Sequence, residues 1–274
     1  MRGLALLLIL AASVFALNVV ASVKSLAIIA EPVVGNVKYL MPPGASPLFW
    51  KPGPQQVQEA LQADIFLNTL HWPFERQIAE QRSGPSLPPL VPGTPAVALS
   101  ELGFAVLRMP NGELNPHGWW LYAPNAFQLM GELAAKACQL EPQNCLSFVK
   151  AFEREVETSR KVLEECFMNG KKAVVMLPGE QYIVANFGVQ TTYVVMQKGP
   201  VVTGLALRKA VDALRSSDFL VVSDMSANTP AARYMIAYAH RLGKPVVKVY
   251  LLNPPVNTFH DFLRITCEAL SEGR

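Results

Sequence analysis

Four side chains in this sequence are of the types that bind transition-metal ions, and they lie where a folded chain would present them to a ligand. His71 follows a segment that we expect to form a strand, and His117 lies in a loop before an expected helix. Glu180 and Asp224 follow two expected strands in the second half of the chain. Imidazole together with carboxylate suits zinc or manganese more than calcium. Isolated histidines more often cap or pack, so a structural role for His71 is the alternative interpretation.

The remaining histidines and the aromatic residues have weaker claims to a site. His240 falls within an expected helix and His260 near the start of one, so we expect both to be solvated or structural. Trp72 and Trp119 flank the loops that carry His71 and His117. Such tryptophans either pack the junction between the two halves of the chain or form an aromatic pocket for an organic ligand or a metal chelate.

The sequence excludes several classes of function. It contains no G-x-S-x-G, no G-x-G-x-x-G and no P-loop, and its cysteines fall in expected helices, so we expect no enzyme. The net charge of +3 is weak and no run of Lys or Arg exists, which argues against nucleic-acid binding. With 51% hydrophobic and only 16% charged residues, the chain can bury a sizeable core.

The first residues have the composition of a targeting segment. Arg2 precedes an uncharged apolar run, and small residues allow cleavage after Ala16 or Ala21. We favour Ala16, because residues 17–22 form an expected strand that a cut after Ala21 would destroy. An uncleaved membrane anchor is the alternative, since the apolar run approaches the ~20 residues that span a bilayer. Either way we expect the body of the protein outside the cytoplasm.

One stretch organises the expected elements. Apolar residues at three-four spacing predict a single helix over residues 143–169, longer than most globular helices. On both sides strands and helices alternate, which predicts an α/β fold with parallel sheets. We therefore expect two lobes with parallel sheets flanked by helices, residues 17–142 and 170–274, joined by one long spine helix. The alternative is an ordinary long surface helix.

Some finer expectations concern the connecting segments. Residues 83–95 are rich in proline and are expected to form a surface loop, and residues 96–99 and 105–109 are expected to form short strands. Cys138 ends one expected helix and Cys145 begins the spine helix after a short turn. We therefore predict a disulfide between these two cysteines, which the compartment outside the cytoplasm permits.

Several segments in order along the chain resemble one family. They are VVAS, MPPGASPLFWKPGPQQVQEALQADIFL, NPHGWWLYAPNA, EQYIVANFGV and KPVVKVYLLNP. Together they are similar to the zinc- and manganese-type solute-binding proteins of ABC transporters, over nearly the whole chain after the targeting segment. The resemblance implies two α/β lobes hinged on a long helix, a metal ion as the transported ligand, and an ABC transporter permease in the membrane as partner.

The same resemblance implies four metal ligands, most of which are replaced here. The family's first histidine corresponds to Leu48 and its second to His117. The third ligand, a histidine or glutamate, corresponds to Leu177, and the fourth, an aspartate, corresponds to Asn253. One matched ligand of four does not hold zinc, which takes three or four donors. The segment at residues 83–95, where the family has a histidine-rich loop, has no histidine.

We therefore expect a divergent site between the lobes of a metal-ion solute-binding protein. His117 and His71 would bind the metal from the first lobe, with Glu180 or Asp224 from the second, and such a bridging site would favour a closed arrangement. Leu48, Leu177, Asn253, Trp72 and Trp119 are expected to line the ligand pocket. The alternative is a two-lobe protein that has lost metal binding and serves an organic or metal-chelate ligand or a structural role.

Overall fold

The computed structural model describes residues 17–45, 49–91, 94–197, 199 and 202–272. The expected targeting segment and Leu48 lie outside these residues, so the structure bears on neither. Within the described residues, no helix is both long and apolar enough to cross a membrane.

Two parallel four-stranded sheets form the two lobes, with the same strand order in each, β2-β1-β3-β4 and β6-β5-β7-β8. The first sheet contains β1 (Val19–Ala21), β2 (Val37–Tyr39), β3 (Ile65–Leu67) and β4 (Ser86–Leu87), connected by α1 (Lys24–Val34), α2 (Pro54–Gln62) and α3 (Pro73–Gln81). The second contains β5 (Lys172–Val175), β6 (Gln190–Val194), β7 (Phe219–Ser223) and β8 (Val246–Val249), connected by α7 (Pro178–Ala185), α8 (Gly204–Arg215) and α9 (Pro230–Arg241). The predicted two-lobed α/β fold is confirmed.

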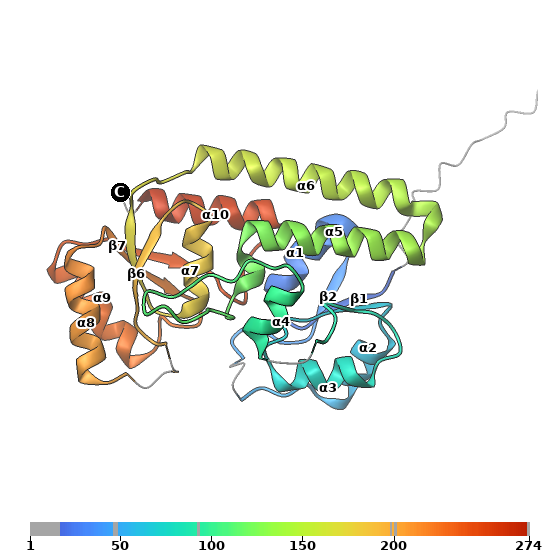
Figure 1. The fold of residues 1–274 in the computed structure, drawn as a ribbon, viewed down its shortest axis with the longest axis horizontal. Coiled ribbons are helices and arrows are strands. Elements are labelled where there is room, and N and C mark those ends of the chain that lie inside the picture. Colours follow the sequence, from blue (N-terminus) through green and yellow to red (C-terminus); the bar gives the residue numbers. More distant parts are fainter. Residues whose placement is uncertain (1–16, 46–48, 92–93, 198, 200–201, 273–274) are drawn as a thin grey trace, which may run out of the picture.

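A long helix lies along both lobes, as predicted (Figure 1). This is α6 (Cys145–Glu165), which packs against α5 (Ala123–Leu140), α1 and the last helix, α10 (Phe259–Glu272). It begins after the short 3-10 turn η2 (Pro142–Asn144) and ends four residues before the predicted Asn169. The chain leaves the helix there because the Met168 N–H donates to the Phe187 carbonyl, 2.7 Å away, at the end of α7.

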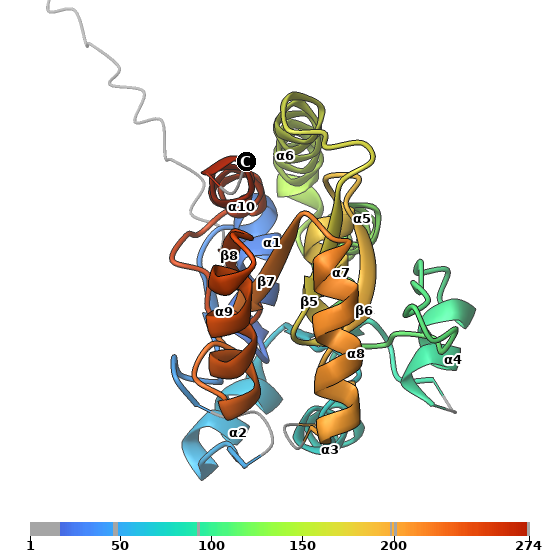
Figure 2. The same cartoon turned by 90° about the vertical axis from the view of Figure 1, so that its left-hand side faces the viewer.

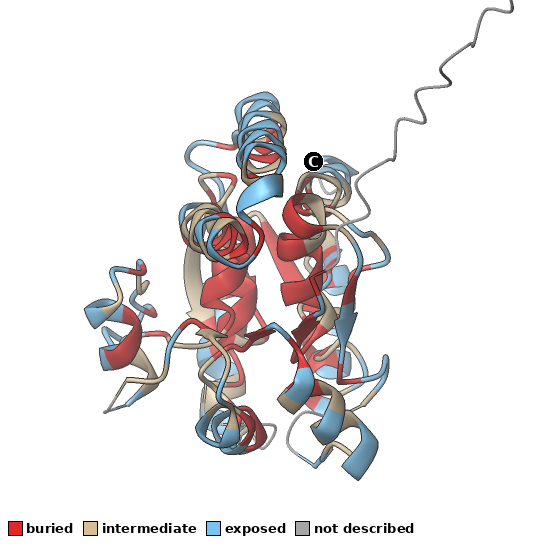
Figure 3. Cartoon of the chain, turned by 90° about the vertical axis from the view of Figure 1, so that its right-hand side faces the viewer, coloured by how far each residue is buried: buried red, intermediate tan, exposed pale blue. Residues whose placement is uncertain are grey.

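The hydrophobic core is continuous from one lobe to the other. One cluster of buried side chains runs from Leu17 and the first sheet through α5 and α6 to the second sheet and Leu270. A second cluster fills the space between the second sheet and the helices α8 and α9 that cover one of its faces (Figure 2). One side of α6 is exposed, whereas the inner strands β1, β3 and β7 are buried (Figure 3). The lobes are therefore packed together as well as connected.

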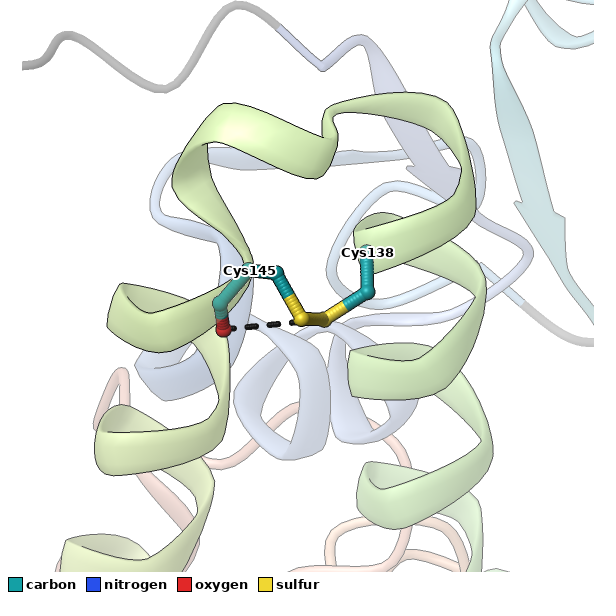
Figure 4. Close-up of a disulfide and its surroundings, with 2 residues drawn as sticks. All are labelled: Cys138 and Cys145. Atoms are coloured by element: carbon teal, nitrogen blue, oxygen red, sulfur yellow. Dashed lines mark hydrogen bonds between the residues drawn. A yellow bond between two sulfur atoms is a disulfide. The ribbon is translucent and has the colours of Figure 1, made fainter.

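Two disulfides fix the ends of α6. Cys138 and Cys145 join α5 to the start of α6 with Cα atoms 4.3 Å apart, which confirms the predicted bridge (Figure 4). Cys166, directly after α6, is bonded to Cys267 in α10, 101 residues away in sequence. This second bridge was not predicted from the sequence.

The expectations for residues 83–109 were partly wrong. Residues 96–99 belong to the helix α4 (Pro95–Glu101), which begins at a proline, a favoured first residue. Residues 105–109 form only an isolated bridge, between Arg108 and Leu114. Two of their N–H groups bond to side chains instead, since Ala105 donates to Asn125 and Leu107 to the Tyr182 hydroxyl. Within the expected loop, Ser86 and Leu87 form β4 because they pair with β3.

Candidate metal site

A cavity of about 500 Å³ lies between the two lobes, at the carboxyl ends of the strands of both sheets. This is the edge at which open parallel sheets bind their ligands. The first lobe contributes Phe49, His71, Trp72, His117, Gly118 and Trp120 to the wall of this interlobe cavity. The second lobe contributes residues that follow its four strands, among them Leu177, Met196, Met225, Thr229, Leu251 and Leu252. The interlobe cavity is therefore mainly apolar, with two imidazoles on one side.

His71 and His117 meet at the wall of this cavity. The His117 Nδ1 and His71 Nε2 atoms are 3.1 Å apart, and the two ring centroids are 4.5 Å apart at an interplanar angle of 78°. The Nδ1 atom of His71 is buried without a hydrogen-bond partner among the described residues. Two residues that are 46 positions apart in sequence thus form one pair of facing nitrogen donors.

Burial favours the neutral form of both imidazoles. Burial lowers the pKa of His71 to about 4, with a further contribution from repulsion by His117. Burial also lowers the pKa of His117. A neutral imidazole presents a free lone pair, which is the form that ligates metal ions.

A buried carboxylate shapes the turn that carries His71. Glu75, in the first turn of α3, accepts the backbone N–H groups of Thr69, His71 and Trp72 and the hydroxyl of Thr69, at 2.7–3.1 Å. The Glu75 side chain is 1% exposed. Leu70, which lies between Thr69 and His71 in the sequence, has a φ of 59°. This is the sole positive φ outside glycine among the described residues. The backbone before His71 is therefore strained and held by Glu75.

His117 is positioned by contacts to both lobes. The side-chain amide oxygen of Asn115 accepts the backbone N–H of His117 at 3.0 Å. The amide group of the same Asn115 side chain donates across the lobes to the Pro178 carbonyl at 2.8 Å and to Gln181 at 2.9 Å. The asparagine of the NPH motif thus ties the histidine loop to α7.

Glu180 does not face the histidine pair. Its carboxylate accepts the Met176 and Leu177 N–H groups at 2.6 and 3.0 Å and the Ser226 hydroxyl at 2.7 Å. Burial raises its pKa to about 7 despite these donors. The residue is completely buried and does not line the interlobe cavity, so it caps α7 in the way that Glu75 caps α3.

Asp224 and Asn253 also lie away from the pair. The Asp224 carboxylate accepts the Leu251 N–H at 2.7 Å and the Asn253 N–H at 3.1 Å, which fixes the turn after β8. Neither residue lines the interlobe cavity. Among the described residues, no group of three or more His, Cys, Asp or Glu side chains is close enough to hold a metal ion. The structure thus brings together two of the four predicted metal ligands.

The predicted pocket residues divide into two groups. Leu177 and Trp72 line the interlobe cavity. Trp119 is completely buried in the first lobe, where it packs against Phe104 and donates from its indole to the Thr69 carbonyl at 2.9 Å. The neighbouring Trp120 lines the cavity instead and donates to Ser25 at 2.9 Å.

Sequence reasoning missed two sulfur-containing side chains in the wall of this cavity. Met196 and Met225, which follow β6 and β7, both line the interlobe cavity. Their position directly after strands of the second lobe is the same signal that singled out Asp224, but methionine is ordinarily an apolar core residue.

The backbones of the two lobes touch beside His117. Gly118 has a φ of 76°, and a Cβ atom built on it would lie 2.7 Å from the Gly179 Cα atom. Nearby, the Tyr182 hydroxyl donates to the Asn115 carbonyl at 2.5 Å, and Asn186 bonds to the backbone of Leu121 and Ala123. Helix α7 is therefore bonded along its length to the segment that carries His117.

We predict that Gly118→Ala destabilises the protein by about 2–4 kcal/mol, through the left-handed backbone and the overlap with Gly179. Gly112→Ala is the control, because Gly112 has a similar φ of 88° but open space around its missing Cβ. It isolates the backbone contribution of about 1–2 kcal/mol. Chemical denaturation of both variants measures the difference, and equal losses would show that the lobes can separate at this contact at no cost.

Two parallel α/β lobes joined by a long helix, with a ligand cavity between them, define the class of two-lobed solute-binding proteins. Solved structures of this class share the fold over nearly the whole chain. The manganese complex of the solute-binding protein FpvC from Pseudomonas aeruginosa is 14% identical, with 94% of this chain and 99% of that chain covered and a TM-score of 0.70. A periplasmic metal-binding protein from Candidatus Liberibacter asiaticus is 16% identical, with coverages of 93% and 98% and a TM-score of 0.70.

A third structure, a mutant of the laminin-binding adhesin Lmb from Streptococcus agalactiae, is 18% identical, with coverages of 94% and 99% and a TM-score of 0.73. The family model described as zinc-uptake complex component A, periplasmic, matches residues 19–273, so the chain belongs to that family. This confirms the family resemblance that the sequence motifs indicated. The protein is a solute-binding protein of the metal-ion type, a component of a transport system. No curated protein gives a significant sequence match.

Proposed function

We propose that this protein carries a metal ion in the interlobe cavity, with the His117 Nδ1 and His71 Nε2 atoms as ligands. The observation that supports this most is the pair of neutral imidazoles with nitrogens 3.1 Å apart at the cavity wall. A single ion about 2.0–2.1 Å from each nitrogen, the usual metal–imidazole distance, fits that separation. Without an ion, the N–H of one imidazole donates a hydrogen bond to the facing nitrogen of the other.

The strained turn before His71 gives independent support. Holding Leu70 at a φ of 59° costs of order 1–2 kcal/mol, and four hydrogen bonds to Glu75 maintain it. Packing alone does not require a histidine at the end of such a turn. Strain of this kind is concentrated at ligand sites, where it fixes the geometry in advance.

The proposal predicts that wild-type protein, purified without a His-tag, binds a transition-metal ion at one site. Zinc and manganese are the first ions to test, because the family takes up zinc and FpvC has been solved with manganese. We expect His71→Ala and His117→Ala each to weaken binding at least about a hundredfold, since each removes a direct ligand.

His240→Ala is the matched control, because His240 is exposed on α9, away from the cavity, and should leave binding unchanged. Isothermal calorimetry and elemental analysis measure these affinities. Equal binding by the wild type and both cavity variants would refute the assignment of the pair.

We also propose that the protein delivers its ion to an ABC-type permease after export. The family is periplasmic.

The first strand, β1, lies inside the first sheet, where it pairs with both β2 and β3. Cleavage after Ala21 would remove this strand, so we expect the mature protein to begin at Leu17. N-terminal sequencing of protein from its native host checks this, and a start at Ser22 would contradict it.

A further inference from the structure

The donors that face the interlobe cavity are all uncharged. No aspartate, glutamate or cysteine is among the described residues of its wall, and Glu180 and Asp224 are engaged elsewhere. The second lobe instead presents the thioethers of Met196 and Met225. Met196 is 3% exposed, and its sulfur accepts the hydroxyl of Thr229, another residue of the wall, at 3.7 Å. Imidazoles from one lobe and thioether side chains from the other thus line the same cavity.

We propose that the ion carried here is a soft monovalent cation, Cu(I), held by His71, His117, Met196 and Met225. The inference rests on the proposed function, since it needs the histidine pair to be a metal site. Thioether sulfur is a soft donor that favours Cu(I), and imidazole accepts copper as readily as zinc. Manganese, in contrast, prefers carboxylate, carbonyl and water oxygens.

The charge of the ion also favours Cu(I). A divalent ion bound by four neutral donors would keep its full double charge within a wall of indole and leucine side chains, where an unpaired charge is costly. A monovalent ion keeps half of that charge, and the electrostatic cost of burial grows faster than linearly with charge. Trp72, Trp120, Leu177 and Leu251 therefore form a wall that suits Cu(I) better than Zn²⁺ or Mn²⁺.

The test compares soft and hard ions on the same variants. Ag(I) serves as a redox-inert probe, and Cu(I) is kept reduced with ascorbate and titrated against the chromophoric chelator bicinchoninate. The central variant is the Met196→Leu/Met225→Leu pair, which conserves side-chain volume and removes both sulfurs. Met235→Leu is the control, because Met235 is completely buried in α9 and does not line the cavity.

We expect the wild type to bind Cu(I) and Ag(I) at least a hundredfold more tightly than Zn²⁺ or Mn²⁺. The methionine pair variant should lose at least tenfold in affinity for Cu(I) and Ag(I), with zinc affinity and thermal midpoint unchanged, and Met235→Leu should lose nothing. X-ray absorption of the Cu(I) complex should show sulfur as well as nitrogen neighbours.

The outcomes separate this inference from the function on which it rests. Metal binding that needs His71 and His117 but is unaffected by the methionine substitutions would overturn the Cu(I) assignment and leave the carrier function standing. Tighter binding of Zn²⁺ or Mn²⁺ than of Ag(I) would do the same. If none of the four ions binds the wild type, the proposed function fails, and the inference fails with it.

Discussion

Replacing Glu75 with alanine should lower the free energy of unfolding by about 3–5 kcal/mol and weaken metal binding at the histidine pair. The carboxylate is buried and accepts four hydrogen bonds, three of them from backbone N–H groups. Of these N–H groups, that of His71 also has a longer contact, 3.3 Å, to the Thr69 hydroxyl oxygen. Each buried donor left without a partner costs roughly 1–3 kcal/mol, offset in part where water enters. His71 loses the contact that fixes its backbone, so its imidazole no longer meets His117 in one geometry.

Glu180→Ala is the matched control for Glu75→Ala. Glu180 also follows a proline at the start of a helix and accepts two backbone N–H groups and one hydroxyl. We expect a comparable loss of stability but unchanged metal affinity, because Glu180 does not touch the histidine pair. Urea denaturation and metal titration of both variants, at a temperature where both are folded, measure the two effects. If Glu180→Ala and Glu75→Ala lost metal affinity equally, Glu180 would have to be considered a metal ligand after all.

The second large effect concerns the bridge between Cys166 and Cys267. It closes a loop of 101 residues, whereas the bridge between Cys138 and Cys145 closes one of seven. In the loop-entropy model these lengths correspond to about 4.7 and about 2.5 kcal/mol. We therefore expect the Cys166→Ala/Cys267→Ala variant to lose about 2 kcal/mol more than the Cys138→Ala/Cys145→Ala variant.

Denaturant unfolding of the two alanine variants, each with the other bridge intact, measures this difference. The removed sulfurs of Cys166 and Cys267 also leave space where α10 packs on α6, which adds to the loss. A smaller loss for the long loop would show that the unfolded chain keeps α6 and α10 close together without the bridge.

The fold followed from features that are local in sequence. The alternation of strands and helices fixes two parallel sheets, because each crossover has one favoured hand. The spacing of apolar residues located α6, and the short turn between Cys138 and Cys145 identified their bridge. The bridge between Cys166 and Cys267 could not be derived in this way, since it depends on how α10 returns to α6 across the second lobe.

The site was predictable only in part, for a similar reason. His71 and His117 were recognised from their positions at strand and loop ends, and the structure brings them into contact. Glu180 and Asp224 were selected in the same way, but Glu180 accepts backbone N–H groups of its own turn. Asp224 accepts those of Leu251 and Asn253, in the turn after the neighbouring strand β8. Position after a strand shows that a side chain is near the cavity edge, whereas its direction depends on which backbone donors need an acceptor.

The close contact between Gly118 and Gly179 has a consequence for how the proposed membrane partner would recognise the metal-loaded protein. Together with the hydrogen bonds between α7 and the His117 segment, and with the shared core, this contact joins the two lobes rigidly. We therefore expect an ion that enters the interlobe cavity to change the angle between the lobes very little. On that basis we expect the proposed membrane partner to distinguish the loaded from the empty protein by the side chains around the cavity mouth, so that recognition depends on local surface rather than on overall shape.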